Sequence, residues 1–169
     1  MIRVGFGYDA HRLEPGRPLI LGGIEIPHHL GLKGHSDADV LTHALGDALL
    51  GAVAAGDLGR HFPDSDPAYR GISSLTLLER IMAVVQSRGY QPMNVDITVV
   101  AEKPRLAPYV PQMIDKLAPI LGLAPEAVSI KATSTEKMGF AGREEGIAAY
   151  AVVLVATEFP PLPWAPDLG

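Results

Sequence analysis

The sequence contains no cysteine, and this absence excludes two kinds of structure. None of its 169 residues can form a disulfide or bind a metal as a thiolate. Any metal in this protein must therefore be held by histidine and carboxylate side chains. Folding must rest on a hydrophobic core, and a hydrophobic content of 47% in a chain of this length is sufficient for one domain.

The sequence also lacks a long apolar run and an excess of basic residues. The longest apolar stretch, residues 147–156, is well short of the ~20 residues that span a bilayer. Residues 1–3 lead directly into a strand pattern, without a basic and apolar leader segment. A net charge of −5 argues against nucleic-acid binding, which normally uses a basic surface. We therefore expect a cytoplasmic domain of enzyme size that binds neither membranes nor nucleic acid.

Hydrophobic periodicity predicts an α+β fold. Strands are expected over residues 3–12, 95–101, 128–133 and 146–157, with a hairpin over 19–26, and helices over 36–54, 73–88 and 111–121. This order predicts a mixed sheet with helices packed on one face, a sandwich of the ferredoxin-like or chorismate-mutase-like kind. Residues 1–158 form one domain in this interpretation, and the proline-rich residues 159–169 form an extended tail.

The last predicted strand, residues 146–157, is apolar on both of its faces. Helices on one side of the sheet can cover only one of these faces. We therefore expect the other face to be covered by another subunit.

Asp9, His11 and His43 are the strongest candidates for a metal site. Asp9 and His11 are two positions apart in a strand, so their side chains project from the same face. His43 lies on the polar stripe of the first predicted helix, between Asp39 and Asp47. Either aspartate is a candidate to orient its ring, unless both are solvated charges of the helix face, with Asp39 also closing a capping box with Ser36. One carboxylate and two imidazoles suit a tetrahedral metal that keeps a fourth position open, although an ordinary hydrogen-bonded histidine pair is the alternative.

Two further segments are candidates for binding anions. Ser36 is expected as the N-cap of the first helix, where free N–H groups favour an anion and His35 adds a donor. The alternative is that Ser36 only caps the helix and binds no anion. Thr133 to Lys137 follows a strand with hydroxyls, a carboxylate and an ammonium group, and a glycine-rich loop with Arg143 comes next. This cluster suits phosphate oxygens, with Glu136 on a hard cation such as Mg²⁺, unless it is a solvated strand end. The polar loop over 57–71 is long enough to indicate a functional loop.

Four strings of the sequence resemble the 2-C-methyl-D-erythritol 2,4-cyclodiphosphate synthase family: GYDAHRL, GHSDADVLTHALGDALLGA, GDLGRHFPDSDP and KATSTEKMGFAGREEG. The similarity runs in order through nearly the whole chain, except the proline-rich tail. It implies a homotrimer with its sheets packed around the threefold axis and active sites between subunits. The implied reaction cyclises 4-diphosphocytidyl-2-C-methyl-D-erythritol 2-phosphate to the 2,4-cyclodiphosphate and releases CMP, within the non-mevalonate isoprenoid pathway.

The same resemblance implies roles for individual residues. A zinc-type ion is assigned to Asp9, His11 and His43, and a magnesium or manganese ion to Glu136 with the substrate phosphates. His35 and Ser134 are assigned to stabilising the transition state. The residues assigned to binding the substrate are Asp9, His11, His35, Ser36, Asp57, Gly59, Phe62, Pro63, Asp64, Ser65, Asp66, Ala101, Arg105, Leu106, Ala107, Thr133, Ser134, Thr135, Glu136, Phe140 and Arg143.

Within that set, the resemblance distributes the substrate over several segments. Residues 57 and 59 contact the methylerythritol part, residues 62–66 form a loop over it, and residues 101–107 form a cytosine pocket largely through backbone groups. Residues 133–136 hold the nucleotide phosphates. Phe140 and Arg143, with Glu145, resemble residues around a cavity on the trimer axis that holds an isoprenoid diphosphate in relatives.

The sequence departs from the family at Ser134, where relatives commonly have threonine. The hydroxyl is kept, so contact with phosphate is expected to persist.

Two other functions stay open for these residues. One is a zinc-dependent phosphohydrolase with Glu136 or Asp57 as general base, and the other is a trimeric module that binds phosphorylated ligands without turnover.

Overall fold

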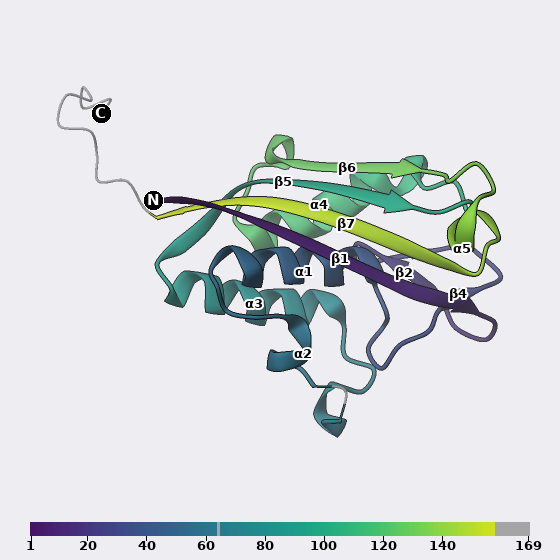
Figure 1. The fold of residues 1–169 in the computed structure, drawn as a ribbon, viewed down its shortest axis with the longest axis horizontal. Coiled ribbons are helices and arrows are strands. Elements are labelled where there is room, and N and C mark those ends of the chain that lie inside the picture. Colours follow the sequence, from purple (N-terminus) through teal and green to yellow (C-terminus); the bar gives the residue numbers. More distant parts are fainter. Residues whose placement is uncertain (64, 158–169) are drawn as a thin grey trace.

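The computed structural model describes residues 1–63 and 65–157, which form a sheet with three helices on one face (Figure 1). Five strands lie in the order β4-β1-β7-β5-β6, and β2 pairs with β3 in a separate two-stranded sheet. The elements are β1 (Ile2–Glu14), β2 (Leu19–Leu21), β3 (Ile24–Ile26), β4 (Gly31–Leu32), α1 (Val40–Ala52), α2 (Leu58–His61), η1 (Pro67–Tyr69), α3 (Ser74–Ser87), β5 (Tyr90–Val100), η2 (Ala107–Tyr109), α4 (Val110–Leu121), η3 (Pro125–Ala127), β6 (Val128–Thr133), α5 (Gly139–Gly142) and β7 (Gly146–Thr157). The tail expected over residues 159–169 lies outside the described residues.

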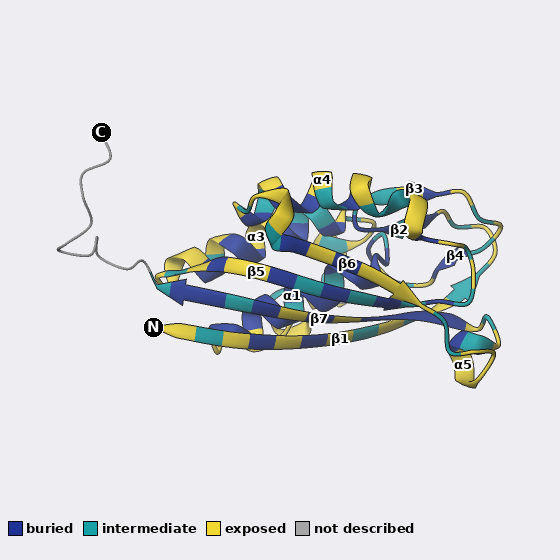
Figure 2. Ribbon diagram, turned by 90° about the horizontal axis from the view of Figure 1, so that it is seen from above, coloured by how far each residue is buried: buried dark blue, intermediate teal, exposed yellow. Residues whose placement is uncertain are grey.

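The sheet is mixed, as the sequence predicts. β1 and β5 are both antiparallel to β7, whereas β5 and β6 are parallel. The helices α1, α3 and α4 cover one face (Figure 2). The predicted hairpin, the helices α3 and α4 and the strands β6 and β7 are therefore confirmed, and so is the one-sided placement of the helices. Among the described residues, no helix is long and apolar enough to cross a bilayer.

Two glycines of β1 allow α1 to lie directly on the strand. A Cβ atom at Gly5 or Gly7 would come within 1.9 Å or 2.0 Å of a backbone oxygen of α1, so neither position tolerates a side chain. Because side chains alternate along a strand, Asp9 and His11 point to the same helix-covered face as these glycines. The close approach brings side chains of α1 within reach of Asp9 and His11.

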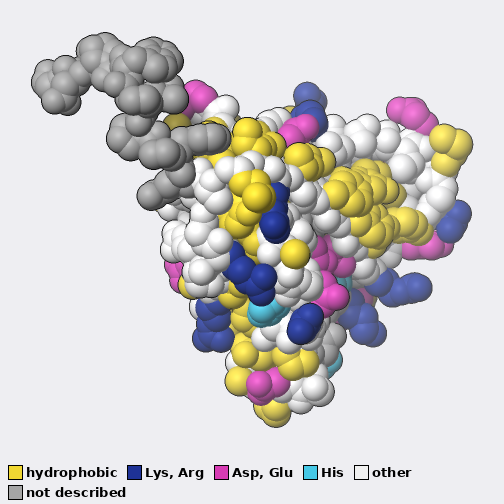
Figure 3. Space-filling view, turned by 60° about the vertical axis from the view of Figure 1, so that its left-hand side comes forward, with side chains coloured by type: hydrophobic (Ala, Val, Ile, Leu, Met, Phe, Trp, Pro, Cys, Tyr) yellow, Lys and Arg dark blue, Asp and Glu magenta, His cyan; other side chains and the backbone are white. Residues whose placement is uncertain are grey.

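The opposite face of the sheet is apolar and exposed in the single chain. Six large hydrophobic side chains on this face are 41–65% exposed: Ile2, Val4, Phe6, Tyr8, Tyr150 and Val152. The rings of Tyr8 and Tyr150 are 4.9 Å apart, so the side chains already pack on one another across the two strands. A contiguous hydrophobic patch is visible where this face turns into view (Figure 3). Apolar surface of this extent is typical of a contact site for another molecule.

The first helix begins later than the sequence predicts. We expected it to start at Ser36, but α1 starts at Val40 with Asp39 as its N-cap. Ala38 adopts a left-handed conformation with φ of 58°, which cannot continue a helix, and the Asp39 carboxylate accepts a hydrogen bond from the Thr42 N–H instead. Ser36 is therefore not a helix cap.

Two segments expected as loops contain short helices, and one strand is longer than expected. The 57–71 segment holds α2 and η1, capped by the carboxylates of Asp57 and Asp66. The 139–146 segment begins with α5. β5 starts at Tyr90 instead of Val95, because the sheet accommodates Pro92 through a register shift between residues 92 and 94.

Candidate metal centre

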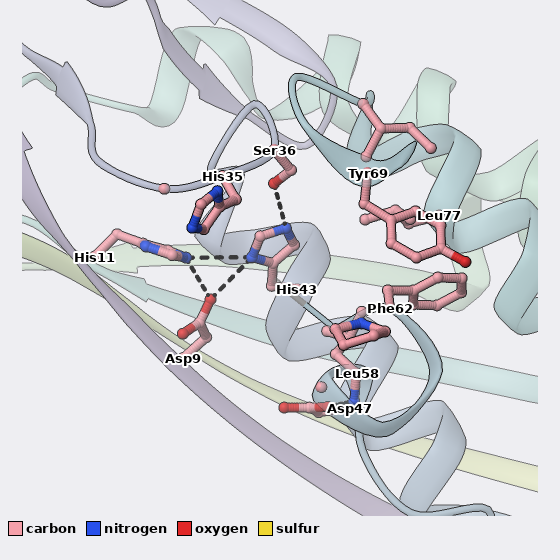
Figure 4. A pocket seen from close by; sticks show the side chains of 14 residues that line it. Asp9, His11, His35, Ser36, His43, Asp47, Leu58, Phe62, Tyr69 and Leu77 are labelled. Carbon is pink, nitrogen blue, oxygen red and sulfur yellow. Dashed lines mark hydrogen bonds and ion pairs between the residues drawn. The ribbon is translucent and has the colours of Figure 1, made fainter. Parts of the chain in front are cut away.

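Asp9, His11 and His43 each direct one ligand atom toward a common point (Figure 4). Oδ2 of Asp9 is 2.9 Å from Nε2 of His11 and 3.2 Å from Nδ1 of His43, and the two nitrogens are 3.2 Å apart. Around a tetrahedral zinc ion with bonds of about 2.0–2.1 Å, ligand atoms are separated by about 3.3 Å. The three atoms therefore have the spacing of three corners of such a tetrahedron.

In each imidazole ring, the nitrogen that faces away from the common point is hydrogen-bonded as well. Nδ1 of His11 is 2.7 Å from the backbone oxygen of Lys33, so this nitrogen carries the proton and Nε2 is left as the ligand atom. Nε2 of His43 is 3.0 Å from the Ser74 hydroxyl and 3.1 Å from the Ser36 hydroxyl. These contacts orient each ring so that its other nitrogen faces the common point.

The prediction that Asp39 or Asp47 orients His43 is wrong. The fully buried Asp39 carboxylate accepts hydrogen bonds from the N–H groups of Gly22 and Gly23 and from Thr42, which ties the hairpin to the start of α1. The Asp47 carboxylate accepts a hydrogen bond from the N–H of the first residue of α2 at 2.8 Å. Each aspartate lies one helical turn from His43, but its carboxylate points to a neighbouring element instead of the ring.

The electrostatics of the triad favour a positive charge at its centre. Burial alone would raise the pKa of Asp9, but hydrogen bonds to His11 and His43, together with the charges of these rings, hold it well below its ordinary value. Burial alone would lower the pKa of His43, but the hydrogen bond to Asp9 and the charge of Asp9 outweigh it and raise this pKa. The space between the Asp9 carboxylate and the two rings therefore favours a positive charge, which a metal ion would supply.

The triad lies at one end of a cavity of about 560 Å³. The residues that line it are Asp9, His11, Gly34, His35, Ser36, His43, Asp47, Leu58, Gly59, Phe62, Pro63, Tyr69, Ile72 and Leu77. The predicted residues His35, Ser36, Gly59, Phe62 and Pro63 are thus gathered with the triad. The sequence did not point to the apolar wall of Leu58, Tyr69, Ile72 and Leu77, because these side chains look like ordinary core residues until the 57–71 segment folds over α1.

His35 and Ser36 belong to a braced loop, not to a helix N-terminus. The Arg17 guanidinium donates hydrogen bonds to the backbone oxygens of Gly34 at 2.6 Å and Ser36 at 2.8 Å, on either side of His35. The Ser36 hydroxyl accepts a hydrogen bond from the Ala38 N–H. An anion at this loop would therefore meet side-chain donors without the help of a helix dipole.

Asp57, Ser65 and Asp66 of the predicted set are not among the residues that line this cavity. The Asp57 carboxylate is used to cap α2, since it accepts a hydrogen bond from the Arg60 N–H at 2.9 Å. Ser65 and Asp66 line a smaller hollow of about 270 Å³ that also includes His35. Asp64 lies outside the described residues.

The segments predicted to bind the nucleotide meet at one edge of the sheet. β5 and β6 are parallel, so residues 101–107 and 133–136 follow neighbouring strand ends, and the Ala101 N–H donates to the Thr133 backbone oxygen at 3.0 Å. The Ser134 hydroxyl lies 3.2 Å from the Glu136 carboxylate. Arg105 and Ala107 are exposed, whereas the Leu106 side chain is buried in the core and leaves only its backbone available.

One chain does not bring the triad and this second group together. None of the residues in 101–107 or 133–136 is among those that line the triad cavity. Thr133 pairs in register with Val100, which alternates with the buried Val99, so the Thr133 side chain faces the open side of the sheet. The triad faces the helix-covered side. Thr133 and the triad are therefore on different faces of the same sheet.

Phe140 and Arg143 are separate from both groups. Phe140 lies in α5 with 40% of its surface exposed. The Arg143 guanidinium follows α5 and contacts the Glu145 carboxylate at 2.8 Å. This ion pair precedes β7 and is exposed.

Comparisons with known proteins agree on one family. The model of the YgbB family matches residues 2–156. A curated relative from Symbiobacterium thermophilum, named 2-C-methyl-D-erythritol 2,4-cyclodiphosphate synthase, is 62% identical over 90% of this chain and 98% of its own length. A solved structure of a synthase of that name in a CDP-bound form has 37% identity and a TM-score of 0.84, covering 91% of this chain and all of the other. The bifunctional IspDF of Campylobacter jejuni has 40% identity and a TM-score of 0.90, covering 94% of this chain and 43% of that protein.

Proposed function

This chain belongs to the YgbB family, and on that premise we propose that the triad cavity is the metal-binding half of a cyclodiphosphate synthase active site. The activity is that of the curated relatives, the formation of 2-C-methyl-D-erythritol 2,4-cyclodiphosphate in isoprenoid biosynthesis. The observation that carries the assignment of the site is the triangle of ligand atoms from Asp9, His11 and His43, with edges of 2.9 to 3.2 Å, at the end of a cavity.

The reaction is an intramolecular phosphoryl transfer. An oxygen of the 2-phosphate of 4-diphosphocytidyl-2-C-methyl-D-erythritol 2-phosphate forms a bond to the β-phosphorus. The bond between the β-phosphorus and the oxygen that bridges to the cytidine phosphate breaks, and CMP leaves with that oxygen. No protein nucleophile is needed, so the protein has to align two anionic phosphates and neutralise their repulsion.

The residues present fit a divalent ion. Two imidazoles and a carboxylate at tetrahedral spacing are a ligand set of zinc, and a bound zinc ion acts as a Lewis acid on phosphate oxygen. We assign the zinc-type ion to Asp9, His11 and His43. We assign a second ion, magnesium or manganese, to Glu136 together with substrate phosphates, because carboxylate and phosphate oxygens are the usual ligands of hard cations.

The other residues of the cavity bind and orient the substrate in this proposal. The His35 ring, held in place by the Arg17-braced loop, donates a hydrogen bond to a phosphate oxygen and stabilises charge in the transition state. The Ser36 hydroxyl binds a phosphate oxygen beside it. Phe62, Leu77 and the other apolar wall residues enclose the carbon skeleton of methylerythritol and limit the access of water.

Residues 101–107 and 133–136 hold the cytidine diphosphate part from the edge of the sheet. Main-chain donors and acceptors of 101–107 read the cytosine edge, and Arg105 assists from the surface. Thr133, Ser134 and Thr135 donate hydroxyl hydrogen bonds to the nucleotide phosphates, and Ser134 also supports the transition state. This part of the proposal is supported by the CDP-bound synthase whose fold this chain shares.

The two halves require a second copy of the chain. Thr133 and the triad lie on different faces of one sheet, and the open face carries the exposed apolar residues of β1 and β7. We assign this face to a homotrimer with the sheets around its axis, so that each cavity is completed by residues 133–136 of a neighbour. Phe140 and Arg143 would then surround the axis, where the guanidinium suits the diphosphate of an isoprenoid ligand.

The test is incubation of the zinc- and magnesium-loaded protein with the CDP-methylerythritol 2-phosphate substrate. We expect CMP and the cyclic diphosphate to appear in equal amounts by chromatography, and both to form far more slowly with the His43→Ala variant. Release of a linear diphosphate would contradict the synthase and favour a phosphohydrolase. Binding without any turnover would contradict both.

A further inference from the structure

Behind His43 lies a buried hydroxyl on a different helix. Ser74, the first residue of α3, is 1% exposed, and its Oγ atom is 3.0 Å from Nε2 of His43. The preceding residue, Ser73, already caps α3 by accepting a hydrogen bond from the Leu75 N–H. Capping of the helix therefore does not account for a second, fully buried serine hydroxyl at this position.

Asp37 holds Ser74 by two hydrogen bonds. One carboxylate oxygen accepts from the Ser74 N–H at 2.9 Å, and the other accepts from the Ser74 hydroxyl in a short contact. Because the hydroxyl hydrogen is given to the carboxylate, the Oγ lone pairs remain free to accept the Nε2–H of His43. The direction of each hydrogen bond in the chain from His43 through Ser74 to Asp37 is thereby determined.

This direction fixes the protonation of the ring. An Nε2–H donated to Ser74 leaves Nδ1 without a proton in the neutral imidazole, and Nδ1 is the atom 3.2 Å from both the Asp9 carboxylate and the His11 ring. A carboxylate behind a metal-binding histidine is a common way to orient the ring and make it a better ligand. Here a serine hydroxyl lies between the two groups.

We propose that Asp37 and Ser74 are positioning residues of the metal centre, which act on the metal only through the Nε2–H of His43. This inference rests on the proposed function, since it presumes that the triad binds a divalent ion. Ser36 is also near Nε2 at 3.1 Å, but its oxygen accepts the Ala38 N–H and its own hydrogen stays available to a ligand in the cavity. The relay through Ser74 thus leaves Ser36 for the substrate.

The test compares zinc affinity in four variants by competition with a chromogenic chelator, without substrate. Ser74→Ala removes the hydroxyl, and Asp37→Asn keeps its size but replaces one accepting oxygen with an amino group. Ser74→Thr keeps a hydroxyl at this position. Ser73→Ala is the matched control, because it removes the neighbouring serine hydroxyl of the same helix end, which does not touch His43. Thermal unfolding of each metal-free variant is measured alongside.

We expect Ser74→Ala to weaken zinc binding by about 10- to 100-fold, and Asp37→Asn to weaken it in the same direction. Ser73→Ala should bind zinc as the unaltered chain does, although it lowers thermal stability. Ser74→Thr should keep most of the zinc affinity of the unaltered chain. In the zinc-loaded protein, the ring Nε2–H proton of His43 should give a slowly exchanging NMR signal that Ser74→Ala abolishes and Ser73→Ala retains.

Each other outcome overturns the inference. Equal zinc affinity in Ser74→Ala and the unaltered chain would exclude the relay, and equal losses in Ser74→Ala and Ser73→Ala would reduce Ser74 to a structural residue. If Ser74→Ala does not fold, Asp37→Asn decides by the same two measurements. Failure of the unaltered chain to bind zinc would instead contradict the metal site of the proposed function, and the inference with it.

Discussion

The two halves of the proposed active site are built in opposite ways. In the triad half, hydrogen bonds join residues that are 31 to 37 positions apart in the chain. His43 contacts Asp9, His11 and Ser74, and Asp37 contacts Ser74. The side-chain hydrogen bonds of the 133–136 half run between residues one to three positions apart, and its residues are exposed or half-buried. The first half is preorganised by the fold of a single chain, whereas the second is a surface turn that, in the proposed function, a ligand and a neighbouring subunit complete.

This difference separates what each half can contribute to catalysis. A preorganised site lowers the barrier because its groups need no rearrangement during the reaction. A turn held by local contacts loses conformational freedom when the ligand binds, so part of its interaction energy is offset by ordering. Changes in the triad half should therefore have the larger effects, and four predictions test that order.

Loss of a triad ligand should have the largest effect. His43→Ala removes a metal ligand and the partner of Asp9, so we expect it to abolish stoichiometric zinc binding and to lower the rate of CMP release by about a thousandfold, since metal ions contribute several kcal/mol to such reactions. Zinc content after dialysis and a CMP assay measure the two effects. His29→Ala, on the exposed loop after β3, is the control and should change neither. Undiminished zinc binding by His43→Ala would contradict the assignment of the triad.

Removal of the Glu136 charge should have the next largest effect and should spare the other half. Glu136→Gln takes away the proposed ligand of the second ion, so we expect CMP release to fall by about a hundredfold while zinc affinity at the triad is unchanged. Glu126→Gln, another exposed glutamate, should leave both values as they are. A loss of zinc affinity in Glu136→Gln would show that the two halves are not independent.

Acidification should weaken the triad half selectively. Because the pKa of His43 is raised, this ring keeps its proton to a higher pH than a free histidine, and zinc has to displace that proton. Zinc affinity should therefore be constant above the raised pKa and fall about tenfold for each pH unit below it. Isothermal titration in buffers of different ionisation enthalpy measures both the affinity and the proton released. Zinc affinity independent of pH from 5 to 8 would contradict the proposed ligand.

The smallest effect is expected at the position where the chain departs from its relatives. Ser134→Thr adds one methyl group at a partly exposed site and keeps the hydroxyl beside Glu136, so CMP release should stay within about twofold. Ser134→Ala removes a hydrogen bond worth about 1 kcal/mol or somewhat more, so we expect a loss of about tenfold. The CMP assay at saturating substrate distinguishes the two. A larger loss in Ser134→Thr than in Ser134→Ala would mean that shape, and not the hydroxyl, matters there.

The sequence predicted the triad but not what supports it. Alternation along β1 was enough to place Asp9 and His11 on one face, and helical periodicity turned His43 toward them. The Asp37–Ser74 contact joins the loop before α1 to the first residue of α3, 37 positions away, and no local pattern marks such a pair. The sequence pattern also misplaced the start of α1. Ser36 and Asp39 are three residues apart, which is the spacing of a capping box. The left-handed conformation of Ala38 between them, which the sequence does not reveal, prevents a helix from starting there.

For the 133–136 half, the sequence indicated the residues but not their position relative to the triad. Residues 133–136 are recognisable in the sequence because polar groups gather at a strand end, and the parallel pairing of β5 with β6 brings Ala101 beside Thr133. Their separation from the triad could not be predicted from periodicity, since it depends on which face of the sheet Thr133 occupies. That face is set by the register of β6 against β5, a long-range property of the fold.

The division of the active site between subunits is tested most directly by mixing two inactive variants. His43→Ala has an intact 133–136 half, and Glu136→Gln has an intact triad half. If each site is formed by the triad of one subunit and the 133–136 turn of its neighbour, equal amounts denatured and refolded together should recover roughly a quarter of the unaltered activity, the share of interfaces with two intact halves in a random trimer. Activity no higher than the mean of the two variants alone would contradict a shared site and place both halves of the chemistry within one chain.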